Sequence, residues 1–313
     1  MDRSSSGPLP PSGRQHVIAH GTGEVVVTEV GATLRSYTVA GAAVVDGFDE
    51  SELCSDGRGQ VLAPWPNRLG DGRYEFGDRH GRAAWDEPQR RNAIHGLVRW
   101  LAWELRGHAQ NSLTLACLLE PQPGYPWRIT LEVEYHLGRG GLTVRTSARN
   151  LDDTPAPFGL GFHPYVTVGS VVDEARLRLV ADRHLRSDDR GLPVGLERVA
   201  GSELDFRVAR PIGPTRLDTA YTQLARDEDG VARVELRHPD GERRVVLWMD
   251  RAFGYVMVYS GDAVAAPDRR RRALAVEPMT CPPDALRVGT DVVTLAPGST
   301  WSGTWGITPT PSA

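Results

Sequence analysis

Residues 128–149 read RITLEVEYHLGRGGLTVRTSAR, and this stretch decides the fold. Apolar side chains alternate with polar ones over 129–137 and again over 142–148, on either side of the glycine-rich run at 138–141. A period of two places every second side chain on one face, as in a β-strand with one buried side. The glycines between the two halves permit a tight turn. The stretch therefore predicts an antiparallel hairpin.

Short apolar runs of the same kind recur along the chain, each bounded by Gly, Pro, Asp or Asn. They lie at residues 24–30, 32–39, 112–119, 175–181, 231–237, 243–249, 255–260, 273–277 and 292–296. The turn-like sequence His238-Pro239-Asp240-Gly241 separates two of them. No stretch has the 3.6-residue period of an amphipathic helix. We therefore expect an all-β fold, a large antiparallel β-sandwich.

The organisation of the chain follows from its breaks in composition. No Pro-rich linker interrupts residues 15–305, which favours one domain over two. Both ends are rich in Ser, Pro and Gly and poor in aromatic and branched apolar residues, a composition typical of disorder. We predict a single β-sandwich domain over residues 15–308, with disordered tails at 1–14 and 309–313.

Charge argues against a nucleic-acid partner. The formal net charge of the 313 residues is -4, which removes the broad positive field that such binding needs. All the basic charge is arginine, and the run Arg269-Arg270-Arg271-Arg272 has two interpretations. It could clamp a phosphate, but a solvated loop beside a strand is the interpretation we favour.

Cysteine usage and the N-terminal sequence bear on the compartment. The three cysteines, Cys54, Cys117 and Cys281, are far apart and lack a C-x-x-C spacing, so neither a disulfide framework nor a zinc site is indicated. The first 15 residues lack the apolar run of a signal peptide, and no segment is apolar over the length that a bilayer requires. We predict a cytoplasmic protein with no membrane partner.

Polar residues stand out where Pro or Gly frames them. Asn67 and Arg68 follow Pro64-Trp65-Pro66, His95 precedes a glycine, and His163 lies within FGLGFHPY. The strand ALAV at 273–276 runs directly into Glu277-Pro278. Each has an ordinary explanation by itself, since a lone histidine is more often a hydrogen-bonded structural residue and an arginine more often pairs at the surface. Their order along the chain carries more information than any one of them.

In that order the segments resemble the aldose 1-epimerase (galactose mutarotase) family. The resemblance covers nearly the whole folded body. The matching elements are Asn-Arg-Leu and Gly-Arg-Tyr at 67–74, His-Gly at 95–96, His-Pro-Tyr at 163–165, Leu-Asp at 217–218, Glu-Pro and Pro-Asp-Ala within 277–285, Leu-Ala-Pro-Gly-Ser at 295–299, and the Trp301 to Trp305 strand. Several ordered matches are much more specific than one.

The resemblance implies a galactose mutarotase-like supersandwich with a sugar cleft on one concave face. It assigns Glu277 as the catalytic base and His163 as the catalytic acid. Four further residues match positions that bind the sugar: Asn67, Arg68, His95 and Asp218. The implied partner is a small-molecule sugar, and the implied assembly is a monomer or a homodimer. Trp65 and Trp100 lie near these motifs and could stack on a sugar ring, although core packing is the more frequent role.

The implied reaction suits these groups. Interconverting α and β anomers requires a base to take the proton of the anomeric hydroxyl while an acid protonates the ring oxygen. A carboxylate with a pKa near ~4.3 and an imidazole with a pKa near ~6.5 can supply these roles at neutral pH. Protons alone carry the chemistry, so we expect no cofactor and no metal.

Three other functions remain open at this point. A non-catalytic carbohydrate-binding sandwich would use the same aromatic and hydroxyl-binding groups without an acid/base pair. A glycosidase ordinarily needs two carboxylates, whereas the matched set offers one with histidines. A hexose-6-phosphate 1-epimerase would use the same chemistry, and the abundant arginines could receive its phosphate.

Overall fold

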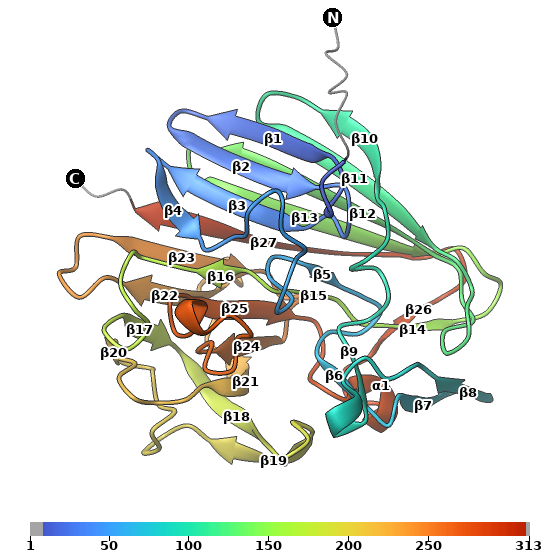
Figure 1. The fold of residues 1–313 in the computed structure, drawn as a ribbon. Helices are drawn as coiled ribbons and strands as arrows, with labels where there is room; N and C mark the ends of the chain where they lie inside the picture. Colours follow the sequence, from blue (N-terminus) through green and yellow to red (C-terminus); the bar gives the residue numbers. More distant parts are fainter. Residues whose placement is uncertain (1–8, 311–313) are drawn as a thin grey trace, which may run out of the picture.

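The computed structural model describes residues 9–310 and is built almost entirely from antiparallel strands (Figure 1). Two large sheets, of 12 and nine strands, carry most of the chain. Within the described residues, helix is limited to α1 (Ala285–Val288) and the 3-10 turns η1 (Pro88–Arg90) and η2 (Pro267–Arg269). The predicted fold class, an all-β supersandwich, is confirmed.

The nine-stranded sheet contains the hairpin that the sequence predicted. Ile129 pairs with Asn150 and Gly138 with Gly141, and the apolar side chains of both strands are buried while most polar ones are more exposed; Thr146 and Asn150 of the second strand are the buried exceptions. In spatial order the strands are β10 (Glu104–His108), β11 (Ser112–Leu119), β12 (Ile129–Gly138), β13 (Gly141–Asn150), β27 (Thr300–Thr310), β23 (Arg244–Met249), β22 (Ala232–Arg237), β17 (Arg176–Leu179) and β20 (Arg210–Pro211).

The 12-stranded sheet carries the residues that matched the sugar site. Its main path runs β1 (Gln15–His20), β2 (Gly23–Thr28), β3 (Leu34–Val39), β4 (Ala42–Val45), β16 (Tyr165–Val166), β25 (Leu274–Met279), β24 (Tyr255–Tyr259), β21 (Asp218–Leu224), β18 (Ala181–Ser187) and β19 (Pro193–Arg198). The short strand β15 (Gly161–Phe162) pairs with β25 and with β5 (Val61–Leu62). Since β25 has neighbours on both sides, it lies in the interior of the sheet.

The core lies between the two sheets. Strands β1 and β2 lie over β12 in Figure 1, and Tyr135 of β12 donates a hydrogen bond to the main-chain oxygen of Ala32, 2.6 Å away. The largest wholly buried apolar side chains include Trp103, Trp127 and Trp305. Their burial removes apolar surface from water, which is the main force holding the sheets together.

Small strand pairs form a rim beside the 12-stranded sheet. They are β6 (Arg68–Gly70) with β9 (Asn92–Ile94), β7 (Arg73–Phe76) with β8 (Arg79–Arg82), and β14 (Ala156–Phe158) with β26 (Val293–Leu295). Helix α1 lies against β6 and β7 (Figure 1). This rim positions Arg68 and its neighbours.

Both predicted tails are partly ordered. The main-chain oxygen of Ser12 accepts a hydrogen bond from Val30, and Ser12 is buried. At the other end, β27 continues to Thr310 because Arg244 of β23 pairs with that residue. A backbone hydrogen bond to Val30 at one end and pairing with β23 at the other therefore hold residues that the predicted tails had placed outside the folded body. The rest of the predicted tails, 1–8 and 311–313, lies outside the described residues.

The arginine run at 269–272 fastens loops. Arg269 donates to the main-chain oxygen of Gly47 at 2.7 Å, and Arg271 pairs with Asp173 and Asp262. Both arginine side chains are less than a quarter exposed, at 24% and 19%. Arg270 and Arg272 are exposed, as the favoured solvated loop predicts, whereas Arg269 and Arg271 are held by their partners.

The structure also bears on the predicted turn at 238–241, the three cysteines and the expected absence of a membrane span. Gly241 donates a backbone hydrogen bond to His238, so the predicted turn between β22 and β23 is present. Cys54, Cys117 and Cys281 are all free and buried. Over residues 9–310 the chain forms no helix with the length and apolar character needed to cross a membrane.

Candidate active site

Glu277 lies at the centre of the 12-stranded sheet. It pairs with Met257 of β24, and only 2% of its surface is exposed. All six residues of β25, Leu-Ala-Val-Glu-Pro-Met, are buried, a pattern typical of strands covered on both faces. A carboxylate in such a strand is removed from water, so it needs partners or must change its protonation state.

His163 faces Glu277 from the connection between β15 and β16. Its Nε2 lies 3.3 Å from Oε1 of Glu277, and the histidine is 5% exposed. Its backbone is fixed on both sides, because its N–H donates to Gln60 and its carbonyl accepts from Gly59. Gly57 has a φ of 70°, and a Cβ there would come within 2.8 Å of the His163 ring. Because glycine has no Cβ, the backbone at this position can pack directly against the imidazole.

His95 and Asn67 are joined by reciprocal contacts. The Asn67 N–H donates to Nδ1 of His95 at 3.2 Å, and the His95 N–H donates to the Asn67 carbonyl at 2.9 Å. Both residues have left-handed backbone, with φ of 65° and 55°, which is uncommon for non-glycine residues. Because Nδ1 accepts a hydrogen bond, the ring proton of neutral His95 lies on Nε2. The His95 ring meets the His163 ring edge to face at 5.4 Å.

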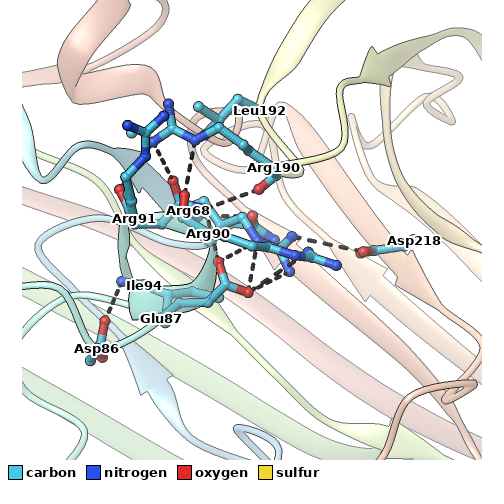
Figure 2. A network of polar contacts seen from close by, with 12 residues as sticks. Arg68, Asp86, Glu87, Arg90, Arg91, Ile94, Arg190, Leu192 and Asp218 are labelled. Atoms are coloured by element: carbon cyan, nitrogen blue, oxygen red, sulfur yellow. Dashed lines mark hydrogen bonds and ion pairs between the residues drawn. The ribbon is translucent and has the colours of Figure 1, made fainter.

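Arg68 follows Asn67 in the chain, and Figure 2 shows its contacts with Glu87 and Asp218. Its Nε and Nη2 form a two-point contact with the Glu87 carboxylate, at 3.0 and 3.2 Å. Its Nη1 lies 3.8 Å from the Asp218 carboxylate at the start of β21. The Asp218 side chain is 46% exposed, so it can reach a ligand from the open side of the site. Glu87 therefore orients the guanidinium so that Nη1 points toward Asp218.

A loop between β18 and β19 covers Arg68. Arg190 donates to Asp71 and to the carbonyls of Arg90 and Arg91, and its own carbonyl accepts from Asn92 (Figure 2). These bonds hold the loop against the rim strands. Two residues farther along, Leu192 is buried against the backbone of Gly70.

Burial moves the two candidate catalytic groups in opposite directions. Desolvation raises the pKa of Glu277 well above 4.5; the nearby Asp218 raises it further and Arg68 opposes the shift. Desolvation lowers the pKa of His163 from 6.5 to about 3, and the positive charges of Arg58 and Arg99 add to this. Both shifts favour the neutral forms, a protonated carboxyl group and an uncharged imidazole. The pair thus contains one proton donor and one proton acceptor in direct contact.

Two polar atoms of the pair lack protein partners. Within residues 9–310, neither Oε2 of Glu277 nor Nδ1 of His163 has a hydrogen-bond partner, although both are buried. Such unsatisfied atoms are rare in native proteins and often mark functional sites. A hydroxyl group can donate to the free carboxylate oxygen. The described residues contain no cluster of three or more His, Cys, Asp or Glu side chains with the geometry of a metal site.

The structure brings all six predicted site residues into one chain of contacts. Glu277 meets His163, His163 meets His95, and His95 meets Asn67. The Asn67 side chain accepts a hydrogen bond from the Arg68 N–H at 2.8 Å, and Arg68 reaches Asp218. This proximity is what a shared site requires.

The two tryptophans near the matched motifs lie in different surroundings. Trp65 is buried in the core, whereas Trp100 is 47% exposed with Arg99 over its ring. The sequence did not indicate Glu87 or Arg190. Glu87 contacts Arg68, 19 positions away, and Arg190 contacts Asp71, 119 positions away. No local sequence pattern indicates contacts over such separations.

Comparison with known proteins decides the family. A family model described as aldose 1-epimerase matches residues 14–308. The chain belongs to the aldose 1-epimerase family. Among curated relatives, the uncharacterized protein YihR of Escherichia coli K12 is 33% identical over 289 residues, covering 92% of this chain and 90% of YihR. An aldose 1-epimerase of Haemophilus influenzae is 25% identical over 163 residues, covering 49% of this chain and 47% of that protein.

Solved structures share the aldose 1-epimerase fold at lower identity. A GalM/aldose epimerase homologue from C. elegans superimposes with a TM-score of 0.85 at 19% identity, covering 96% of this chain and 99% of that one. Galactose 1-epimerase from Lactobacillus acidophilus gives 0.80 at 18% identity, with 95% and 94% covered. The supersandwich is therefore conserved in shape while the sequence has diverged widely.

Proposed function

We propose that this chain catalyses the interconversion of the α and β anomers of a free aldose, with Glu277 and His163 as its acid/base pair. One observation carries the proposal: the two side chains meet at 3.3 Å, buried, with their pKa values displaced in opposite directions. Pairs of groups whose pKa values the environment moves apart are the mark of general acid/base sites. Family membership supports the same reaction.

The mechanism needs the shared proton to move within the pair. When a sugar hydroxyl donates to Oε2 of Glu277, the ionised carboxylate becomes more favourable and the proton can pass to Nε2 of His163. The carboxylate then takes the proton of the anomeric hydroxyl while the imidazolium protonates the ring oxygen, and the bond between C1 and the ring oxygen breaks. Rotation about the C1–C2 bond presents the other face of the aldehyde. The same groups in exchanged roles close the ring, and the proton balance is restored.

The remaining matched residues hold the sugar in this proposal. Asp218 accepts hydroxyl protons, and Nη1 of Arg68 donates beside it. Nε2 of His95 carries a proton and supplies another donor, because Nδ1 is occupied by Asn67. Arg68 and His95 belong to the rim, whereas Asp218 begins β21, two strands from Glu277 in the same sheet.

A neutral sugar fits the rim better than a phosphosugar. The guanidinium groups around Arg68 are already engaged: Arg190 with carbonyls and Asp71, and Arg90 with Glu87 (Figure 2). A 6-phosphate would have to displace these partners. This favours the free aldose over the hexose-6-phosphate.

The decisive experiment is polarimetry or NMR on freshly dissolved α-anomers of hexoses, pentoses and their 6-phosphates. Faster equilibration with the protein than in buffer supports the proposal, and the preference series gives the substrate class. The rate is expected to survive exhaustive chelation, because the steps need only protons. Sugar binding without any acceleration across the panel would point to the non-catalytic carbohydrate-binding alternative.

A further inference from the structure

Arg58 is a fully buried cation behind the proposed catalytic pair. It is 1% exposed and lies between Gly57 and Gly59, just before β5. Its Nη1 donates to the carbonyl and carboxylate of Asp46, at 3.1 and 2.7 Å. Its Nε and Nη2 have no hydrogen-bond partner in the part of the chain that the structure describes. Burying a guanidinium with so few partners is unfavourable, so its position calls for a compensating role.

A stack of rings connects Arg58 to His163. The guanidinium carbon lies 4.2 Å from the centroid of the Tyr165 ring, a cation–π contact. The Tyr165 ring stacks on the His163 imidazole, with centroids 5.1 Å apart and planes 21° from parallel. The Tyr165 hydroxyl is itself fixed, since it donates to the carbonyl of Asp56 at 3.2 Å. The same short segment therefore supplies the cation, the anchor for the tyrosine, and Gly57 against the imidazole.

This arrangement leaves the imidazole little freedom. Tyr165 covers its face, any Cβ at position 57 would come within 2.8 Å of Cδ2, and its backbone is hydrogen-bonded to Gly59 and Gln60. The titratable and charged groups that bear on His163 from the surrounding elements are Arg58, His95, Arg99, Tyr165 and Glu277. The positive charges of Arg58 and Arg99 disfavour protonation of the imidazole, so both lower the pKa of His163.

We propose that Arg58 is a positioning residue for the proposed epimerase reaction: through Tyr165 it holds His163 against Glu277, and its charge disfavours protonation of the imidazole. The inference rests on the proposed function for its catalytic consequence. Its electrostatic consequence can be measured without a substrate. The competing explanation is that Arg58 only ties its loop to Asp46.

The experiment compares Arg58→Met, Arg58→Lys and the control Arg35→Met. Arg35 is a half-buried arginine of β3 that donates to the Phe48 carbonyl, and it makes no ring contact with Tyr165. His163 is followed by ¹⁵N NMR titration from about pH 2 to 8, a range that spans its lowered pKa, and its signal is assigned by its loss in His163→Asn. Steady-state anomerisation gives kcat and KM for the same proteins.

In Arg58→Met we expect the pKa of His163 to rise by about one unit and kcat to fall about tenfold with little change in KM, because alignment of a bound sugar is lost rather than its binding. Arg58→Lys keeps the charge without the planar group, so it should retain the wild-type titration but lose part of kcat. Arg35→Met should match the wild type in both. If Arg58→Met titrates and turns over like Arg35→Met, the inference is overturned.

A second variant covers the case in which Arg58→Met does not fold. Asp46→Asn keeps the guanidinium but weakens its anchor, and the Asp46 side chain is 23% exposed. A shifted His163 titration together with a lower kcat supports the inference, and an unchanged protein contradicts it. If the wild type itself does not accelerate anomerisation, the proposed function fails while the NMR comparison still tests the electrostatic role of Arg58.

Discussion

Strands β12 and β25 are both antiparallel and both paired on two sides, yet they treat polar residues in opposite ways. In β12 buried apolar residues alternate with more exposed polar ones, so Glu134 reaches the surface beside Arg145. In β25 every residue is buried, including Glu277. The outer face of β12 is open to water, whereas His163 and the loop behind it cover the Glu277 side of β25.

The contrast shows at which positions a glutamate points to function. On an alternating strand a carboxylate keeps its charge in water at little cost. On a strand covered on both faces it loses hydration, so its protonation depends on its few neighbours. Glu134 and Glu277 thus form a matched pair: the same residue type, in similar backbone, in different surroundings.

The largest expected effect is on turnover in Glu277→Gln. The amide keeps the size of the side chain but cannot act as a base, so kcat should fall by about 100-fold or more with a modest change in sugar affinity. His163→Asn should behave similarly. The double variant should be little worse than the poorer single variant, because groups acting as a unit lose their benefit together. Initial rates at saturating sugar, with spontaneous mutarotation subtracted, test this, and near wild-type turnover in Glu277→Gln would remove the proposed base.

The second effect is on the pH dependence of the free energy of unfolding. When a group has a higher pKa in the folded state than in the unfolded state, as Glu277 does, its contribution to stability is present at low pH and is lost as pH rises. When the folded-state pKa is lower, as for His163, the contribution is present at high pH and is lost as pH falls. Between pH 4.5 and 6.5, the unperturbed values of Glu277 and His163, the two contributions oppose one another. His163→Asn should therefore lose stability with rising pH, and Glu277→Gln should gain it, each by up to about 1.4 kcal/mol per unit relative to wild type.

Urea unfolding at half-unit pH intervals measures these slopes. The wild-type contribution of the pair should be nearly flat across the window, because the two terms cancel. Slopes of the same sign in the two single variants would contradict opposite displacement of the two pKa values.

A smaller effect is expected at the open edge of the site. Asp218→Asn keeps a hydrogen-bonding side chain but removes the charge, so KM should rise about tenfold, which corresponds to about 1.4 kcal/mol of binding free energy. Asp240→Asn, in the exposed turn between β22 and β23, is the matched control and should leave KM unchanged. Equal KM values in the two variants would remove Asp218 from the sugar-binding set.

The smallest effect closes the comparison. Glu134→Gln makes at the surface the same change as Glu277→Gln, and the ion pair with Arg145 that it breaks spans 3.6 Å between side chains that are 40% and 64% exposed. We expect turnover to be unchanged and the free energy of unfolding to shift by less than about 0.5 kcal/mol. A large loss of activity in Glu134→Gln would contradict the view that burial explains why Glu277 matters for turnover and Glu134 does not.

The sequence predicted the parts of the fold that carry a period. The hairpin shows the expected strands, and so do the nine apolar runs, which became β2, β3, β11, β17, β22, β23, β24, β25 and β26. Strands of two residues, such as β5, β15 and β16, are too short to show alternation, although β15 and β16 flank His163. The order of motifs brought the six site residues to notice. Arg58 was missed because its significance comes from Tyr165 and Asp46, which are distant in sequence.

The position of β27 in the nine-stranded sheet affects how the protein folds during synthesis. This strand, at residues 300–310, is inserted between β13, which ends at Asn150, and β23, which begins at Arg244. Until β27 emerges from the ribosome, the hairpin side of the nine-stranded sheet has an unpaired edge at β13, and the β22–β23 side has another. Open edges of this kind invite pairing with other chains. In the nascent chain these two edges therefore stay open to such pairing until β27 joins the two halves.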